Sequence, residues 1–457
     1  MSSAIDAIVR KLCTEIDVEY VFKLPKRVQE LLYTISKKID TPLGRFYRSF
    51  IEYNRSPTYD LYQTVTCPLH LDDGDTMMTK YIPLQLEKQL AFSKDEIDRF
   101  TQFDPLKLSF YTTCSTFLDQ FKHYMKTEQK ERKQSKHFTN AWLKCWEMIH
   151  FYHLIPSNHS DDFTVFCNAE FPGAFIFAIN QYIKTKTHNK RYKWYANSLW
   201  PGKDKNSDIL GDSFGLYKKY KDHWLMNGDD ASGDVTDPAM IRVIRDRLEK
   251  KVDLYTSDIG IDIPFDKTHE QEVLEAHLNL GQIVCALRTL KEGGSMVCKT
   301  FLFFKPMTLS LLYLLTSVFK EFSISKPMTS RPANSEIYLI GKGYKEDIKI
   351  TEKIENLLFT WDAKKINDWI VPLPTYFYVQ LVYALYYINQ RQIYFLQKNV
   401  EFVKHEYSLS TKPPYIMDIF KRGRKDKNVQ EINVRKQMVD AWKQMYPISS
   451  MKFSDYL

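Results

Sequence analysis

A lysine within an apolar segment is the first residue of this chain that indicates chemistry. Lys299 lies in residues 295–304, which otherwise read as a buried strand introduced by Gly293 and Gly294. Burying a lysine costs free energy unless its charge is used or neutralised. Burial also favours the neutral amine, which can accept a proton. We therefore consider Lys299 a candidate general base.

Four further features accompany Lys299 in a fixed order along the chain. They are a helix with Lys144, a turn at 170–175, a strand end with Asp258 and the segment 334–338 with Glu336. Each also has a purely structural interpretation. Lys144 can be a solvated residue away from the apolar stripe of its helix, Asp258 the start of an Asx turn and Glu336 a surface carboxylate.

The turn at 170–175 contains small residues where a strand leads into a helix. Pro172, Gly173 and Ala174 let a ligand approach the backbone, and the helix N-terminus offers amide donors to a carboxylate or phosphate. The turn matches neither the dinucleotide-binding glycine pattern nor a P-loop. A tight strand–helix turn explains it equally well. Asp234 lies in a loop, where it faces either an adenine ring or water.

These candidates lie in a region of alternating strand and helix patterns. Strands are expected at 163–168, 193–196, 252–257, 295–304 and 336–341, and helices at 174–183, 238–250, 270–290 and 306–319. Such alternation predicts an α/β fold with a mostly parallel sheet and helices on both faces. Ligands of such sheets bind at the carboxyl ends of the strands.

The pattern divides the chain into three parts. Residues 1–136 form an N-terminal extension with helical patterns at 4–15 and 27–38 and a charged, solvated helix at 126–136. Residues 137–345 form the α/β domain, and residues 346–457 a mainly helical C-terminal extension. The dense basic cluster at 421–427 is either a solvated loop or a contact to a phosphate backbone.

Composition sets broad limits on the class of protein. The 457 residues are 44% hydrophobic, and the net charge of +8 is compatible with a polyanionic partner. Seven cysteines are scattered singly, which argues against disulfides and a zinc ribbon and for a reducing compartment. No signal peptide is apparent, and the longest apolar run, 307–319, is too short for a membrane span. We therefore expect a soluble intracellular protein without membrane partners.

Taken in order, Lys144, Asp258, Lys299 and Glu336 resemble the Lys-Asp-Lys-Glu tetrad of the FtsJ-like ribose 2′-O-methyltransferases. The resemblance covers residues 137–345 and is strongest to the adrift-type branch, which acts on the mRNA cap region, and to related proteins of large cytoplasmic DNA viruses. Two departures stand in the turn region: Cys167-Asn168 where an acidic residue is common, and Ala174 in place of a second glycine. The matching stretches are 170–175, 194–199, 256–258, 326–330 and 334–338.

The resemblance implies a Rossmann-like methyltransferase fold and S-adenosyl-L-methionine as the cofactor, with no metal. It implies that Lys299 accepts the proton of a ribose 2′-hydroxyl, while Lys144 orients that hydroxyl. Asp258 would balance charge near the sulfonium, and Glu336 would hold a lysine in position. The cofactor-binding residues it implies are Asn168, Glu170, Pro172, Gly173, Ala174, Phe175, Asn197, Asp234 and Asp258.

The implied function is 2′-O-methylation of RNA in the mRNA cap region, in the host cytoplasm or a virion if the protein is viral. The partner would be the capped 5′ end of mRNA, together with capping or transcription machinery. Two alternatives stay open: a non-catalytic RNA-binding or assembly subunit on this fold, and the same chemistry on ribosomal or transfer RNA. Candidate RNA contacts are Lys326, Arg331, Arg422, Arg424 and Lys425.

Overall fold

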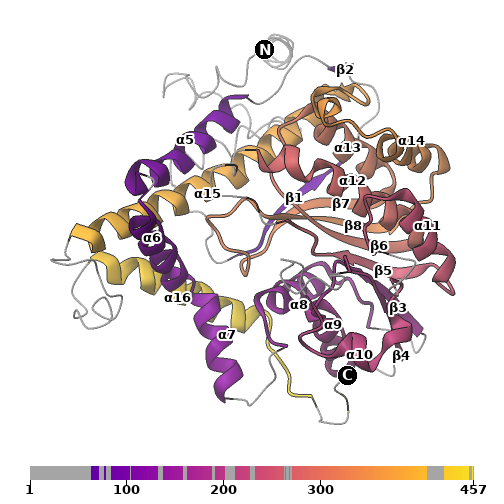
Figure 1. The fold of residues 1–457 in the computed structure, drawn as a ribbon, viewed down its shortest axis with the longest axis horizontal. Coiled ribbons are helices and arrows are strands. Elements are labelled where there is room, and N and C mark those ends of the chain that lie inside the picture. Colours follow the sequence, from indigo (N-terminus) through magenta and orange to yellow (C-terminus); the bar gives the residue numbers. More distant parts are fainter. Residues whose placement is uncertain are drawn as a thin grey trace, which may run out of the picture.

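One mixed sheet organises the chain in the computed structural model (Figure 1). The structure describes residues 63–71, 77–78, 84–102, 104–131, 137–157, 162–187, 191–200, 211–226, 232–261, 263, 267, 270–408, 427–451, 455 and 457. The helical patterns expected at 4–15 and 27–38 lie outside these residues, as do Arg422, Arg424 and Lys425 of the basic cluster.

The sheet has seven strands in the order β1-β7-β8-β6-β5-β3-β4. The parallel part comprises β3 (Asp162–Asn168), β4 (Arg191–Ala196), β5 (Val252–Ser257) and β6 (Leu290–Thr300). The antiparallel part comprises β8 (Ile337–Tyr344), β7 (Phe319–Lys326) and β1 (Val65–Leu69).

The α/β fold is confirmed, but the sheet is mixed rather than mostly parallel. Strand β7 was not predicted, and only ten residues separate it from β8, so the two form an antiparallel pair. The strand expected at 295–304 ends at Thr300. Strands β3 and β5 are buried along nearly their whole length, as expected when helices cover both faces.

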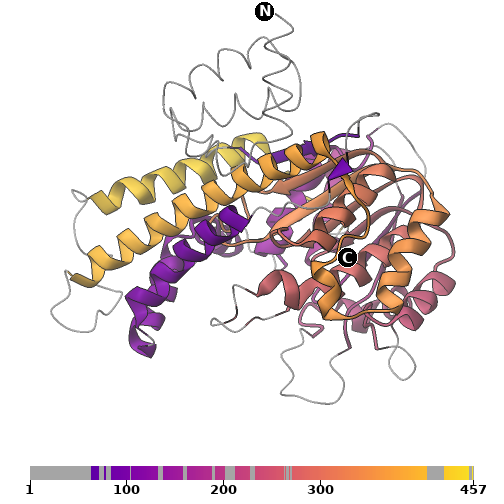
Figure 2. The same cartoon turned by 90° about the horizontal axis from the view of Figure 1, so that it is seen from above.

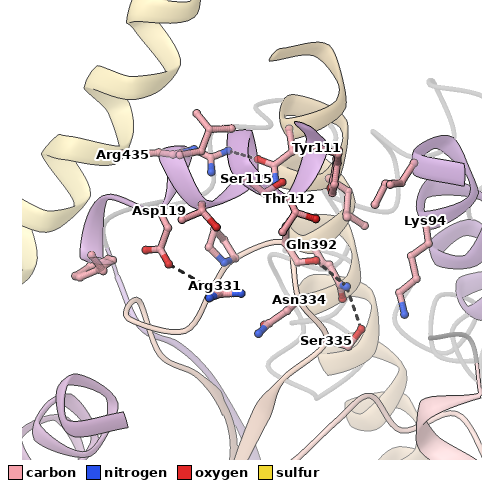
Figure 3. A pocket seen from close by; sticks show the side chains of 18 of the residues that line it. Lys94, Tyr111, Thr112, Ser115, Asp119, Arg331, Asn334, Ser335, Gln392 and Arg435 are labelled. Atoms are coloured by element: carbon pink, nitrogen blue, oxygen red, sulfur yellow. Dashed lines mark hydrogen bonds and ion pairs between the residues drawn. The ribbon is translucent and has the colours of Figure 1, made fainter. Parts of the chain in front are cut away.

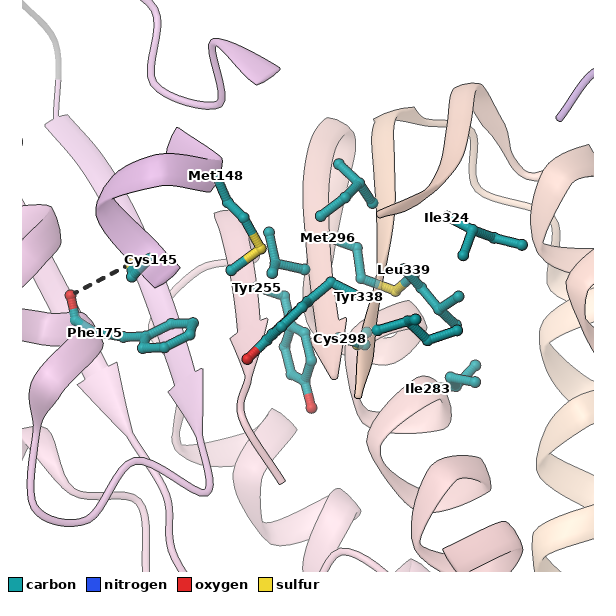
Figure 4. Close-up of a cluster of buried hydrophobic side chains, with 14 of the residues drawn as sticks. Cys145, Met148, Phe175, Tyr255, Ile283, Met296, Cys298, Ile324, Tyr338 and Leu339 are labelled. Atoms are coloured by element: carbon teal, nitrogen blue, oxygen red, sulfur yellow. Dashed lines mark hydrogen bonds between the residues drawn. The ribbon is translucent and has the colours of Figure 1, made fainter. Parts of the chain in front are cut away.

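Helices flank the sheet on both sides (Figures 1 and 2). On one face lie α8 (Asn140–Tyr152) and α9 (Ala174–Lys186), with the short α10 (Leu216–Lys219) near β4. On the other lie α11 (Pro238–Arg247), α12 (Gln271–Thr289), α13 (Pro306–Ser317) and α14 (Ile348–Phe359). The helices α11 and α13 each begin with a proline, which needs no hydrogen bond at that position. Figure 4 shows Cys145 and Met148 of α8 facing Tyr255 and Tyr338 of the sheet in the apolar core.

The two extensions pack together beside the sheet. The helices α5 (Leu84–Thr101) and α6 (Pro105–Leu118) contact the long helix α15 (Thr375–Ser408), while α7 (Gln120–Glu131) contacts α16 (Lys427–Met445). A small second sheet joins β2 (Met77–Met78) to β9 (Leu373–Pro374). Because β1 joins the main sheet, part of the N-terminal extension belongs to the same core as the α/β region. The boundaries at 136/137 and 345/346 stay predictions.

Within the described residues, no helix is both long enough and apolar enough to cross a bilayer.

Candidate active site

The four residues of the predicted tetrad meet at one edge of the sheet. Asp258 directly follows β5, Lys299 is the penultimate residue of β6 and Glu336 directly precedes β8, so three neighbouring strands present them. Lys144 reaches the same point from α8. Residues 144 and 336 are 192 positions apart in the chain, and the fold brings their side chains into contact.

Asp258 lies between the two lysines. The Nζ of Lys299 donates to the backbone carbonyl of Asp258 at 2.8 Å and lies 3.4 Å from its Oδ1. The Nζ of Lys144 lies 3.7 Å from the same Oδ1 and 3.0 and 3.2 Å from the two carboxylate oxygens of Glu336. The four side chains thus form one continuous series in which amines alternate with carboxylates.

Burial and charge together determine the protonation of this series. Burial by itself lowers the pKa of Lys144, but the carboxylates of Asp258 and Glu336 more than offset it, and the pKa is raised. Burial by itself raises the pKa of Glu336, but the nearby Lys144, Lys299 and Lys326 lower this pKa to about 2. Lys144 therefore stays cationic and Glu336 anionic at neutral pH.

Lys144 is not a solvated lysine, and Glu336 is not a surface carboxylate. Their relative exposures are 7% and 8%. We expected Lys144 to lie away from the packed stripe of its helix, but α8 is buried on nearly all sides, including at Lys144. The ion pair with Glu336 accounts for this burial, because a lysine is rarely buried without a partner.

Two side chains that the sequence reading missed complete the series. The hydroxyl of Tyr338 donates to Oδ1 of Asp258 at 2.7 Å, and the hydroxyl of Ser330 donates to Oε1 of Glu336 at 2.7 Å. Tyr338 is also the register partner of Lys299 between β8 and β6. It stands two positions after Glu336, and this period of two was a usable signal that both side chains share one face.

Lys326 was expected to contact RNA, but the structure places it inside the fold. It is 3% exposed, and its Nζ donates to the carbonyls of Asn334 and Glu336 at 2.8 and 2.7 Å and to Oδ1 of Asn334 at 2.5 Å. Burial, together with the nearby Arg391 and Lys144, lowers the pKa of Lys326 to about 7 despite the opposing effect of Glu336. Lys326 thus holds the loop that presents Glu336, and of the described RNA candidates Arg331 is the exposed one.

A second buried carboxylate, Glu147, also holds this loop, and no sequence signal had singled it out. Its oxygens accept hydrogen bonds from the amides of Met328 and Thr329, from the hydroxyls of Thr329 and Thr64, and from Nε1 of Trp442. Burial raises its pKa. Glu147 lies three positions after Lys144 on α8, so one helix face secures both ends of the β7–β8 loop.

The turn between β3 and α9 binds its own carboxylate. Oε1 of Glu170 accepts from the amides of Phe175 and Ile176 at 2.8 and 3.1 Å, so these two donors are not available to a cofactor. Burial raises the pKa of Glu170 to about 8, against the lowering effect of the two amides. Gly173 has φ of +118°, and a Cβ there would lie 2.3 Å from Cδ1 of Leu216. This glycine is therefore required by backbone conformation and by packing.

Beside this turn, the carboxyl ends of β3, β4 and β5 are joined by amide side chains. Nδ2 of Asn197 donates to Oδ1 of Asn168 and to the carbonyl of Gly233, both at 2.9 Å, and Nδ2 of Asn168 donates to the hydroxyl of Ser257. Oδ1 of Asn197 is buried and has no hydrogen-bond partner among the described residues. Oδ1 of Asp234 accepts from the amide and hydroxyl of Thr236. The network leaves one oriented acceptor where a ligand of the parallel strands would lie.

No cluster of three or more His, Cys, Asp or Glu suited to a metal ion occurs in the part of the chain that the structure describes.

The central part of the chain is similar to known proteins. Residues 138–344 match the model of the family described as FtsJ-like methyltransferase. A probable methyltransferase of African swine fever virus is 33% identical over 286 residues, which cover 57% of this chain and 65% of the relative. The cap-specific mRNA (nucleoside-2′-O-)-methyltransferase 2 of Drosophila melanogaster is 32% identical over 257 residues, covering 53% and 35%, and that of Danio rerio is 32% identical over 227 residues, covering 48% and 30%.

This similarity covers only part of each relative. The matched segment spans 65% of the viral protein and 35% and 30% of the fly and fish proteins.

Proposed function

We propose that this chain, which belongs over residues 138–344 to the FtsJ-like methyltransferase family, transfers a methyl group to a ribose 2′-hydroxyl in the cap region of mRNA. The observation that carries the proposal is the buried series of Lys299, Asp258, Lys144 and Glu336 at the ends of β5, β6 and β8. The names of the fly and fish relatives support the class of substrate.

The two lysines have different roles in this proposal. Lys144, held cationic between two carboxylates, orients the hydroxyl oxygen and disfavours a second positive charge nearby. Lys299, in its neutral form, would accept the hydroxyl proton at Nζ. Asp258 keeps the two amines apart and is itself fixed by Tyr338. Orientation of these groups contributes much of the expected rate.

The cofactor we propose is S-adenosyl-L-methionine, which supplies an electrophilic methyl group on a sulfonium sulfur. The buried acceptor Oδ1 of Asn197 fits a ligand with hydrogen-bond donors at this edge of the sheet. The carboxylate of Asp258 suits a cationic centre beside the tetrad. Glu170 would hold the turn in place through the amides of Phe175 and Ile176. The remaining residues that would line the site are Asn168, Pro172, Gly173, Ala174, Phe175 and Asp234.

The proposed function is tested by incubating the protein with methyl-labelled cofactor and matched capped and uncapped RNAs, followed by nuclease mapping of the label. We expect label on a ribose 2′-oxygen near the 5′ end of the capped RNA, and none with Lys299→Ala. Label on a base would overturn the proposed chemistry. Tight RNA binding without transfer would identify a non-catalytic RNA-binding subunit instead.

A further inference from the structure

A cavity of about 340 Å³ lies between the two extensions and the loop that leads into β8 (Figure 3). The helices α5, α6, α15 and α16 form most of its wall, and the β7–β8 loop with the first residue of α12 closes the side toward the sheet. Most of the lining residues lie outside the segment 138–344 that matches the family model. The cavity is therefore a feature that the extensions add to the methyltransferase fold.

The lining combines an apolar surface with several charged and polar side chains. Ile97, Leu118, Leu396 and Met438 are buried apolar residues of the wall. Two of the three basic residues are paired: Nε of Arg331 lies 3.4 Å from Oδ2 of Asp119, and Nε of Arg435 lies 2.7 Å from Oε1 of Glu431 on the same helix. The third is Lys94, whose pKa burial lowers to about 8. A phosphate needs cationic groups that are not already neutralised, and both arginines are paired, so the apolar surface favours a flat, neutral heterocycle as the occupant.

Gln392, on α15, provides a specific polar contact within this wall. It is 2% exposed, and its Nε2 donates to the carbonyl of Ala333 at 3.2 Å and to the hydroxyl of Ser335 at 3.0 Å. Because a carbonyl only accepts, this bond fixes the orientation of the amide. Oε1 of Gln392 then has no hydrogen-bond partner among the described residues. A buried acceptor without a partner is rare in a protein, and an N–H group of a ligand would satisfy it.

The cavity adjoins the catalytic series on two sides. Ser335 lines it, and the next residue is Glu336, which binds Lys144. Gln271 lines it from the start of α12 and donates to Glu275, whose carboxyl group interacts electrostatically with Lys299. The cavity and the catalytic series therefore share two segments of the chain, residues 335–336 and the first turn of α12.

We propose that this cavity takes the base of the nucleotide adjoining the methylated one, unstacked from the RNA and bound by Gln392 and the apolar wall. The proposal rests on the proposed function, since it assumes that the ribose to be methylated lies at the tetrad. Proteins that recognise single-stranded RNA commonly bind its unstacked bases in such pockets. The extensions would then select the substrate, while the FtsJ-like segment performs the transfer.

The test combines a filled cavity with an altered RNA. Thr112 is an exposed residue of α6 that lines the cavity, so Thr112→Trp should fill it without disturbing the core. Leu106→Trp adds the same bulk on α6 at a position that is 71% exposed and outside the lining. The RNA substrates carry a single abasic ribose at one or the other neighbour of the methylated nucleotide.

An abasic ribose at one neighbouring position should raise the KM of the unmodified protein for capped RNA about tenfold, as expected for the loss of one bound base. Thr112→Trp should raise the KM for intact RNA similarly and remove the difference between intact and abasic RNA. Gln392→Met should also raise KM, and Leu106→Trp should not. The proposal would be overturned if the abasic ribose raised the KM of Thr112→Trp as much as it raises the KM of the unmodified protein. It would also be overturned if neither change altered the KM.

RNA binding measured by fluorescence anisotropy separates this proposal from the proposed function. Methyl transfer that is unaffected by Thr112→Trp and by both abasic RNAs would leave the function standing and refute the base site. Binding that depends on the neighbouring base and on Thr112, without any transfer by the unmodified protein, would refute the function and support the base site.

Discussion

Two lysines share one carboxylate in the candidate active site, and their other contacts differ. Lys144 makes ion pairs with Asp258 and Glu336, whereas Nζ of Lys299 donates to the backbone carbonyl of Asp258. A lysine that accepts a proton must be able to exist as a neutral amine, which a guanidinium does not do in proteins. This difference makes the role of Lys299 testable by a substitution that keeps its positive charge.

Lys299→Arg should reduce methyl transfer by about a hundredfold or more, the usual contribution of a general base. Cofactor affinity measured by calorimetry should change little. Lys291→Arg is the matched control, because Lys291 lies on the same strand with a half-exposed side chain that pairs with Asp253. An arginine enzyme that kept most of its turnover would exclude Lys299 as the proton acceptor.

Tyr338 should act as a positioning residue for Asp258. Tyr338→Phe removes a buried hydrogen bond to a carboxylate, which should cost about 1.5–3 kcal/mol in the free energy of unfolding and also lower kcat. The control, Tyr344→Phe on the same strand, removes a bond to the carbonyl of Leu287. It should lower stability without lowering kcat. Equal kcat values for the two variants would show that Tyr338 is only structural.

Glu170 should make stability depend on pH. Its pKa is about 8 in the folded protein against an ordinary value of 4.5, so between these values the folded state holds a proton that the unfolded state has lost. Stability should therefore fall as pH rises through this range, by about 1.4 kcal/mol for each unit of pKa difference. Glu170→Gln cannot ionise, and its amide oxygen can still accept from Phe175 and Ile176.

Urea unfolding at pH 5 and pH 8 measures this effect. The glutamine variant should match the parent protein at pH 5 and exceed its stability at pH 8. The same decline in both proteins would mean that Glu170 is ionised in the folded state throughout.

At the scale of elements, α8 secures the β7–β8 loop at both ends. Lys144 binds Glu336 at the end of the loop, and Glu147 binds Met328 and Thr329 at its beginning. Lys326 bonds to carbonyls within the loop. The position of Glu336 therefore depends on Glu147 and Lys326 as well as on Lys144.

Glu147→Gln should disturb this loop, because an amide nitrogen cannot accept from the donors that now face the second carboxylate oxygen. We expect a loss of about 2–3 kcal/mol in the free energy of unfolding and a reduced kcat. Glu352→Gln, at an exposed position of α14, is the control and should change neither quantity. A normal kcat in a measurably destabilised Glu147→Gln protein would show that the loop keeps its position without this carboxylate.

At the scale of the whole molecule, the α/β region depends on both extensions. Strand β1 covers the edge of β7, and Glu147 accepts hydrogen bonds from Thr64 and from Trp442 on α16. An uncovered strand edge favours aggregation, and a buried carboxylate that loses donors is costly.

A fragment of residues 137–345 alone should therefore aggregate or unfold at a temperature well below that of the full chain. Differential scanning calorimetry and size-exclusion chromatography of both proteins measure this. A monomeric fragment with the thermal stability of the full chain would show that the predicted boundaries mark an independent domain.

The sequence by itself determined the local features of this protein. Strand–helix alternation located most elements of the α/β region to within a few residues, since each element carries its own periodicity and end signals. The order of Lys144, Asp258, Lys299 and Glu336 indicated a resemblance to the FtsJ-like methyltransferases, and the model of that family matches residues 138–344. The positions of Asp258 and Lys299 at strand ends could be anticipated, because parallel strands present their carboxyl ends at one edge.

Only the tertiary structure decided which groups contact one another. The contact of Lys144 with Glu336 spans 192 positions, and that of Glu147 with Trp442 spans 295. No local pattern encodes contacts at such separations, so the burial of Lys326 was missed. The antiparallel β7 was missed as well, since its charged residues interrupt the strand pattern. The cavity between the extensions likewise exists only because helices from both ends of the chain pack against each other.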